Sequence, residues 1–544
     1  MKNNNNKAIP AEGWKGLKEN IVDDATSGFL VFLIALPLSL GIAKASDFPA
    51  IMGLMTAMIG GVLVSFLAGS RLTIKGPAAG LIVIVAGAVE EFGKGDPIAG
   101  WHTALGAILV AGVLQMLFGM IRLGSLVDFF PLSTIHGMLA AIGIIIISKQ
   151  THILFNLAPV NELGKALSEP LDLILAIPHS IMNADPAVAM IGVLSMLTVV
   201  IWPKININWL RKIPSPLVVL TVSIVLAKLM HLDKKYLVHF DQDFIHTIAW
   251  NERFDGIQHI GVFVKYVLMF AVVGSLESLL TVKAMDVMDP YQRKSNANKD
   301  LMAVGFGNIL SSIVGGLPMI SEVARSSANI HNGAKTRFAN FFHGLFMLIF
   351  LFFDLRFSDL IPNAALAALL IGVGLKLASP KEFGRMAKIG FEQLLGFTVT
   401  IIVTLLTDLL IGIAAGITVK LIVQGLLGAP MARMFSAKII KNKNHWDVVG
   451  AAVFSNWLGI RKQLEQYTRS SELNLDFSRC NLVDHTVMDN LLHLQMEFDQ
   501  AGGRLNLIGL DSMKSANKNK HIAGALNRPK QERLNKNGEV KYKP

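Results

Sequence analysis

Three polar or charged side chains stand within stretches that read as membrane segments. Arg325 lies in a segment over 321–331, and Glu277 and Thr281 lie in another over 261–284. Residues four apart share one helix face, so Glu277 and Thr281 are expected side by side. A charge in lipid costs about 2.5 to 3.5 kcal/mol on insertion scales, so each charged group should face a cavity or a partner. The arginine is suited to bind an anion, and the carboxylate is suited to bind a cation or a proton.

Two of the predicted segments are too short to span a membrane. Gly76-Pro77 opens the segment 77–90, and the motif Gly-Gly-Leu-Pro at 315–318 precedes the segment 321–331. A helix that begins inside the membrane presents unpaired N–H groups and about half a positive charge, which attract an anion. The alternative is that glycine and proline only kink two packed helices.

Composition places most of the chain in lipid. It has 544 residues, of which 52% are hydrophobic and 16% charged, against roughly 25% charged in a soluble domain. Fourteen apolar segments are predicted, at 28–44, 50–68, 77–90, 103–121, 128–148, 187–202, 215–231, 261–284, 300–314, 321–331, 337–354, 360–377, 391–408 and 410–427. The short ones are third in each set of seven, which predicts an all-α 7+7 inverted repeat with two half-helices and a site near the bilayer midplane.

The charge of the chain fits a membrane better than a nucleic acid. The formal net charge is +11, but Lys and Arg occupy loops and tails, where they set topology and meet anionic lipid. This pattern predicts a multi-pass inner-membrane protein with both termini in the cytoplasm, and no cleavable signal peptide is evident. The single cysteine, Cys480, fits a reducing compartment.

Composition also predicts the domain boundaries. We expect a cytoplasmic segment 1–22, a transmembrane domain 23–428, a linker 429–444, a small α/β domain 445–513 and a basic tail 514–544. Within the α/β domain, 473–478 and 504–509 read as strands and 484–500 as an amphipathic helix.

Several motifs resemble the sulfate permease family over nearly the whole chain. The shortest are Asp23-Asp24-Ala25 and Ala35-Leu36-Pro37, and the others are Gly76-Pro77-Ala78-Ala79, the run 275–281 (Ser-Leu-Glu-Ser-Leu-Leu-Thr) and 308–336 with Arg325-Ser326-Ser327-Ala328-Asn329. The resemblance implies core and gate domains that move against each other, a homodimer, and a C-terminal STAS domain. In bacterial anti-sigma antagonists, which resemble this domain, a serine near the position of His485 or Thr486 is phosphorylated. The sequence has no clear Asp-Ser motif there, so regulation by phosphorylation is not expected.

The resemblance also implies an anion site. It places the corresponding arginine beside the anion, and the anion-binding residues so predicted are Gly76, Pro77, Ala78, Ala79, Ala324, Arg325, Ser326, Leu38 and Ile42. Leu38 and Ile42 depart from the family pattern and make the wall apolar. An apolar wall offers few donors to a divalent anion, which ranks bicarbonate above sulfate or chloride.

In the sodium-coupled bicarbonate members of the family, an acidic residue and a threonine at the spacing of Glu277 and Thr281 bind sodium, whereas in other members a glutamate is interpreted as a proton site. The resemblance therefore implies either role for Glu277. A salt bridge from Glu277 to Lys283 is the structural alternative, and no other metal is expected. Lys75 and Glu322 also depart from the family pattern, and an ion pair between them across the site is one hypothesis. The alternative is that Lys75 reaches the cytoplasmic interface and that Glu322 caps the start of its own helix.

These features predict secondary active transport of a small inorganic anion by alternating access, coupled to Na⁺ or H⁺. A nucleobase-type transporter and an anion sensor with a STAS-like output are the alternatives. No nucleotide-binding motif or Ser-His-Asp grouping is present, so neither an enzyme nor a cofactor is expected. His102, His136 and His343 lack metal-ligand spacing and are expected to be satisfied within the bundle.

Overall fold

The computed structural model describes residues 9–157, 159, 167, 169–207, 210, 213–238, 251–291, 293–353, 360–511, 513–515 and 526–527. The chain divides into two compact units. One comprises Met1–Gly124 and Ile142–Leu377, and the other comprises Ser125–Ala141 and Ala378–Pro544. This division groups the last membrane helices with the C-terminal domain, unlike the predicted boundaries, which followed composition.

Helices make up almost all of the first unit. They are α1 (Gly13–Ala45), α2 (Ala50–Ile59), α3 (Ser65–Leu67), α4 (Ile82–Gly93), α5 (Pro97–Met120), α7 (Pro170–Met182), α8 (Pro186–Ile201), α9 (Ser215–Leu229), α10 (Ile260–Met288), α11 (Ala297–Ile313), α12 (Val323–His331), α13 (Phe338–Phe353) and α14 (Asn363–Leu377). Helix α6 (Leu132–Leu154) is divided between the two units.

Each of the fourteen predicted segments corresponds to a helix, and α7 and α15 (Pro380–Ile389) are additional. Within the described residues, eight helices are long and apolar enough to cross a membrane, and four apolar helices are shorter. The multi-pass all-α prediction is therefore confirmed.

Local sequence explains where several helices start. Asp96 and Asp185 each precede a proline, and their carboxylates accept hydrogen bonds from the first free N–H groups of α5 and α8. Proline fits the first helical position because its missing N–H would have no partner there.

The two interrupted segments meet as a short antiparallel sheet in the first unit. Strand β1 (Ile74–Pro77) pairs with β2 (Met319–Glu322), with Gly76 opposite Ile320 and Lys75 opposite Ser321. Extended backbone therefore precedes both half-helices, because proline has no N–H to continue a helix. Helix α4 begins at Ile82, after a 3-10 turn at Ala79–Leu81, rather than at the predicted residue 77.

The second unit contains helices and a seven-stranded sheet. Its further elements are α16 (Phe391–Leu406), α17 (Leu409–Leu426), α18 (Met431–Met434), β3 (Lys438–Asn442), β4 (His445–Ala452), α19 (Phe454–Leu464), β5 (Glu472–Asp476), β6 (Cys480–Val483), α20 (His485–Gln500), β7 (Arg504–Ile508), β8 (Lys514–Ser515) and β9 (Leu526–Asn527). The strand order is β7-β5-β4-β6-β9-β8, with β3 on β4.

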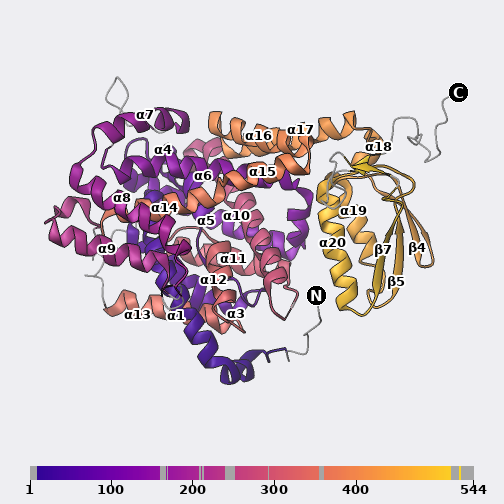
Figure 1. Cartoon of the computed structure of the whole chain (residues 1–544), viewed down its shortest axis with the longest axis horizontal. Coiled ribbons are helices and arrows are strands. Elements are labelled where there is room, and N and C mark those ends of the chain that lie inside the picture. Colours follow the sequence, from indigo (N-terminus) through magenta and orange to yellow (C-terminus); the bar gives the residue numbers. More distant parts are fainter. Residues whose placement is uncertain are drawn as a thin grey trace. The chain divides into compact units, whose positions relative to one another are not determined.

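The small α/β domain is built as the sequence predicted. Burial alternates along β5 and over the first four residues of β4, and Trp446, Val448 and Leu475 join Trp457 of α19 and Phe498 of α20 in one core. Figure 1 shows α19 and α20 along one side of β4, β5 and β7, with the other side of these strands not covered by a described helix. Cys480 is a buried residue of this core.

Candidate functional site

The guanidinium group of Arg325 lies against the backbone of Gly76. Nη1 of Arg325 would be 2.6 Å from a Cβ atom built at Gly76. A side chain at this position would displace the guanidinium group, so β1 and Arg325 of the first turn of α12 are in direct contact here. The structure thus brings Gly76 and Arg325, two predicted site residues, together.

Arg325 is fully buried and its charge is poorly paired. None of its three side-chain nitrogens has a hydrogen-bond partner among the described residues, and Nε is 4.0 Å from the Glu322 carboxylate. A buried donor without a partner carries a desolvation penalty, and for a charged group this penalty is large. A planar guanidinium with free donors matches an oxyanion well, because it can donate two parallel hydrogen bonds.

Glu322 caps the helix that carries Arg325. Its Oε2 accepts a hydrogen bond from the Arg325 N–H at 2.8 Å, so one first-turn donor of α12 is already used. The Ser326 hydroxyl donates to the Glu322 carbonyl and accepts from the Ile74 N–H at 2.9 Å, which ties α12 to β1. Ala324, in the same turn, is exposed.

Glu277 and Thr281 lie in the interior of α10, as their spacing predicted. Both are buried, and the structure shows no hydrogen-bond partner for Glu277 Oε1 or Thr281 Oγ1 in the part of the chain it describes. The Glu277 carboxylate abuts Gly80, where a Cβ atom would collide with it. No described residue forms a salt bridge with Glu277, so the alternative pairing with Lys283 is absent. Through its contact with Gly80, the Glu277 carboxylate lies next to the start of α4.

The predicted ion pair between Lys75 and Glu322 is wrong. Lys75 Nζ donates to Asp300 Oδ1 at 2.9 Å and to the Thr73 hydroxyl, and both Lys75 and Asp300 are fully buried. Lys75 stands opposite Ser321, the neighbour of Glu322. Because side chains alternate along a strand, Lys75 and Glu322 point to opposite faces.

Asp300, the partner of Lys75, was not predicted from the sequence. Its carboxylate also accepts from the Ser70 N–H at 2.9 Å and from the Ser321 hydroxyl at 3.1 Å. An acid at the first turn of an apolar segment was the signal that could have found it.

Four predicted anion-binding residues are apolar and buried. Leu38 and Ile42 are on α1, and Ala78 and Ala79 follow Pro77, which is itself buried. Their contact with an anion stays a prediction.

His343 on α13 is a further polar group that sequence reasoning did not select. It is fully buried, and both ring nitrogens lack a hydrogen-bond partner within the described ranges. The expectation that it is satisfied inside the bundle is therefore wrong for this histidine, while His136 lies 3.7 Å from the Glu382 carboxylate.

Other motif residues hold α1 and α12 in place. The Asp24 carboxylate accepts from the backbone N–H groups of Lys335 and Thr336, at 2.8 and 3.0 Å. Ser27 donates to Asn329, whose amide in turn donates to the Leu72 carbonyl at 2.9 Å. These acidic and amide residues thus position the half-helix.

Comparisons with known proteins agree with this architecture. The sulfate permease family model matches residues 21–403. YvdB of Bacillus subtilis, which carries a provisional sulfate-transporter name, is 27% identical over 72% of this chain and 72% of its own length. The bicarbonate transporter BicA of Synechocystis is 23% identical over 73% of this chain and 68% of its own length.

Solved structures show the same fold. The transmembrane domain of a cyanobacterial bicarbonate transporter BicA matches with a TM-score of 0.63 at 23% identity, covering 73% of this chain and 97% of that domain. The murine Solute Carrier 26 family member A9 anion transporter matches with a TM-score of 0.61 at 16% identity, covering 90% of this chain and 86% of that chain. The chain therefore belongs to the sulfate permease family of membrane anion transporters and is not an enzyme.

Proposed function

We propose that this protein carries out secondary active transport of a small inorganic anion by alternating access. The observation that supports this most is Arg325, a fully buried guanidinium against Gly76 with no described hydrogen-bond partner. An anion that accepts hydrogen bonds from Arg325 removes the penalty of burying its donors. Departure of the anion restores that penalty, so the empty site has a free-energy reason to take up another anion.

Bicarbonate is the favoured substrate, with sulfate or chloride next. Beside Arg325 stands Glu322, 4.0 Å from its Nε, so the positive charge is partly offset. The attraction of such a pair grows only in proportion to the charge of the anion, whereas the cost of desolvating the anion grows more steeply with its charge, so a weakened positive charge favours a monovalent anion. The buried apolar residues Leu38 and Ile42 add no donors for a strongly hydrated anion. Relatives named for sulfate and for bicarbonate are both similar to this chain.

Na⁺ or H⁺ is proposed as the coupling ion, at Glu277 and Thr281. A carboxylate oxygen and a hydroxyl oxygen without described partners suit a hard cation, and the carboxylate alone suits a proton. We further propose that the protein lies in the inner membrane with both termini in the cytoplasm, on the positions of Lys and Arg between the apolar segments. A homodimer is proposed on membership of the sulfate permease family.

Flux into proteoliposomes tests the proposal. Labelled bicarbonate, sulfate and chloride are supplied separately, and Arg325→Ala should lower uptake of the preferred anion about 100-fold, equivalent to about 3 kcal/mol. Arg71→Ala is the matched control, because Arg71 is partly exposed and pairs with Glu12 at the surface. Uptake that survives in Arg325→Ala contradicts the site. Anion binding without uptake by the unaltered protein indicates a sensor instead, and uptake of a nucleobase indicates the other alternative.

A further inference from the structure

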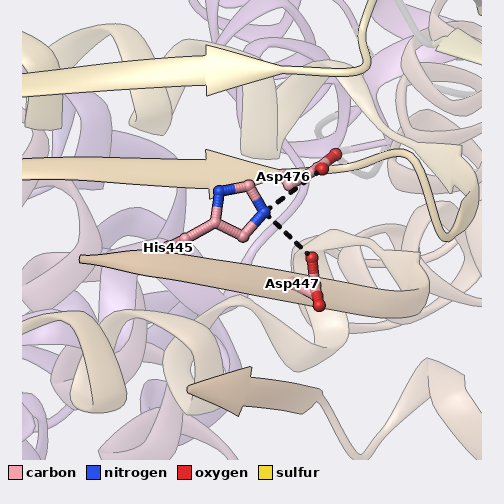
Figure 2. A group of neighbouring side chains, drawn as sticks. All are labelled: His445, Asp447 and Asp476. Carbon is pink, nitrogen blue, oxygen red and sulfur yellow. Dashed lines mark ion pairs between the residues drawn. The ribbon is translucent and has the colours of Figure 1, made fainter. Parts of the chain in front are cut away.

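We propose that His445, Asp447 and Asp476 form a binding site for a divalent first-row transition-metal ion, of the Zn²⁺ or Co²⁺ type, on the open face of the C-terminal sheet. Figure 2 shows the three side chains converging from two neighbouring strands. This inference does not depend on the proposed transport function.

Strand pairing fixes the three residues on one face. His445 and Asp447 are two apart on β4, so they point to the same side of the sheet. Parallel pairing places Asp476 of β5 directly opposite Asp447. The intervening residues Trp446 and Leu475 point into the core, so the triad faces away from α19 and α20. Ligands that come from paired strands need little reorganisation to bind an ion.

The distances fit a metal better than a hydrogen-bonded ion pair. Nε2 of His445 is 3.4 Å from Asp447 Oδ1 and 3.4 Å from Asp476 Oδ2. Charge-assisted hydrogen bonds are about 2.7 to 2.9 Å long, and a single Nε2–H cannot serve two acceptors well. Two ligands at about 2.0 to 2.2 Å from a tetrahedral ion are about 3.4 Å apart. The three ligand atoms all lie within 4.8 Å of one another.

The charges leave room for a cation. Two carboxylates stand together here, and in the described part of the domain His445 is the only cationic partner that either one has. Neutral His445 with two carboxylates gives a formal charge of −2, which a divalent ion balances. One further contact orients a ligand, because Asp476 Oδ1 accepts the Ser478 N–H at 2.7 Å and so turns Oδ2 toward His445.

The ligand set selects the class of ion. Imidazole nitrogen favours zinc and its neighbours over Mg²⁺ or Ca²⁺, which prefer oxygen alone. Three protein ligands leave a fourth position open to solvent, as in sites that exchange water or take an outside ligand.

Metal titration of the full-length, tag-free protein in detergent tests the site. After chelator treatment, Co²⁺ binding is followed by visible absorption and Zn²⁺ by competition. We expect one site per chain that His445→Ala, Asp447→Asn and Asp476→Asn each weaken at least about tenfold. His493→Ala is the matched control, because His493 also stands beside an aspartate, at 3.6 Å from Asp489, on the helical side of the domain.

Binding that is equal in the triple variant and the unaltered protein would overturn the proposal, since the ion would then lie elsewhere. Mg²⁺ binding as tight as Zn²⁺ binding would overturn the assigned class of ion. Thermal stability provides the second measurement: saturating Zn²⁺ should raise the unfolding temperature of the unaltered protein and of His493→Ala. An equal rise in Asp447→Asn, which preserves side-chain size, would also contradict the site.

Discussion

Lys75 and Arg325 are both fully buried cations beside the β1–β2 pair, yet their donors are used in opposite ways. Lys75 donates to Asp300 at 2.9 Å and to the Thr73 hydroxyl. Arg325 has no described hydrogen-bond partner for any side-chain nitrogen. A buried charge that is fully paired holds elements together, whereas one with free donors can meet a ligand. The contrast separates the charge that stabilises the fold from the charge available for transport.

The largest effect is expected where the paired charge is broken. Lys75→Met leaves Asp300 buried without its cation, and Asp300→Asn leaves Lys75 without its anion. Each should lower the free energy of unfolding by about 3 to 5 kcal/mol, and the double variant should recover a large part of that loss. Equilibrium unfolding in mixed micelles measures these values.

The control for this cycle is Glu322→Gln, alone and with Lys75→Met. Since Lys75 and Glu322 point to opposite faces of their strands, their effects should add to within about 0.5 kcal/mol. Stronger coupling of Lys75 to Glu322 than to Asp300 would contradict the pairing in the structure.

Much of the architecture could be predicted from the sequence because lipid imposes simple rules. Apolar length marked the fourteen helices, and Gly76-Pro77 with Leu317-Pro318 marked the interrupted segments. Alternation and helical periodicity marked β5, β7 and α20 in the C-terminal domain. Each of these signals is local, because it can be read from a short stretch of the sequence.

Pairing between distant segments was harder to predict. The choice of Asp300 rather than Glu322 for Lys75 depends on strand register, which puts neighbouring residues on opposite faces. Whether His343 has a hydrogen-bond partner depends on which polar groups surround it in the fold. The triad of His445, Asp447 and Asp476 depends on the parallel alignment of β4 with β5. None of these is set by spacing along the chain.

A third way to bury a titratable group is to keep it neutral, as His485 in the C-terminal domain does. Burial, aided by the positive charge of Lys420 and opposed by Asp489, lowers the pKa of His485 to about 4. The unfolded chain binds this proton near pH 6.5, so stability is constant above that pH and falls as the pH drops from 6.5 toward 4. At pH 5 the loss is about 2 kcal/mol.

His485→Gln should remove this pH-dependent loss, whereas His493→Gln on the same helix should not. Amide hydrogen exchange of α20 at pH 5 and pH 7, corrected for intrinsic rates, measures the difference. An equal loss of protection at pH 5 in His485→Gln and the unaltered protein would assign the pH dependence to another group.

The smallest effect on stability is expected at the unpaired groups of α10. Glu277→Gln and Thr281→Val preserve size and remove oxygens that have no described hydrogen-bond partner, so no hydrogen bond is lost and the free energy of unfolding should not fall. Anion flux should instead lose its dependence on Na⁺ or pH, falling about tenfold under a coupling gradient, which corresponds to about 1.4 kcal/mol.

Ser278→Ala is the matched control on the same helix. The Ser278 hydroxyl accepts the Ser321 N–H at 3.1 Å, so removal of this hydroxyl should lower the free energy of unfolding by about 1 kcal/mol and leave the cation dependence unchanged. If Glu277→Gln destabilises the protein by several kcal/mol while the cation dependence persists, Glu277 belongs with Lys75 among the charges that hold the fold, and the coupling ion must bind elsewhere.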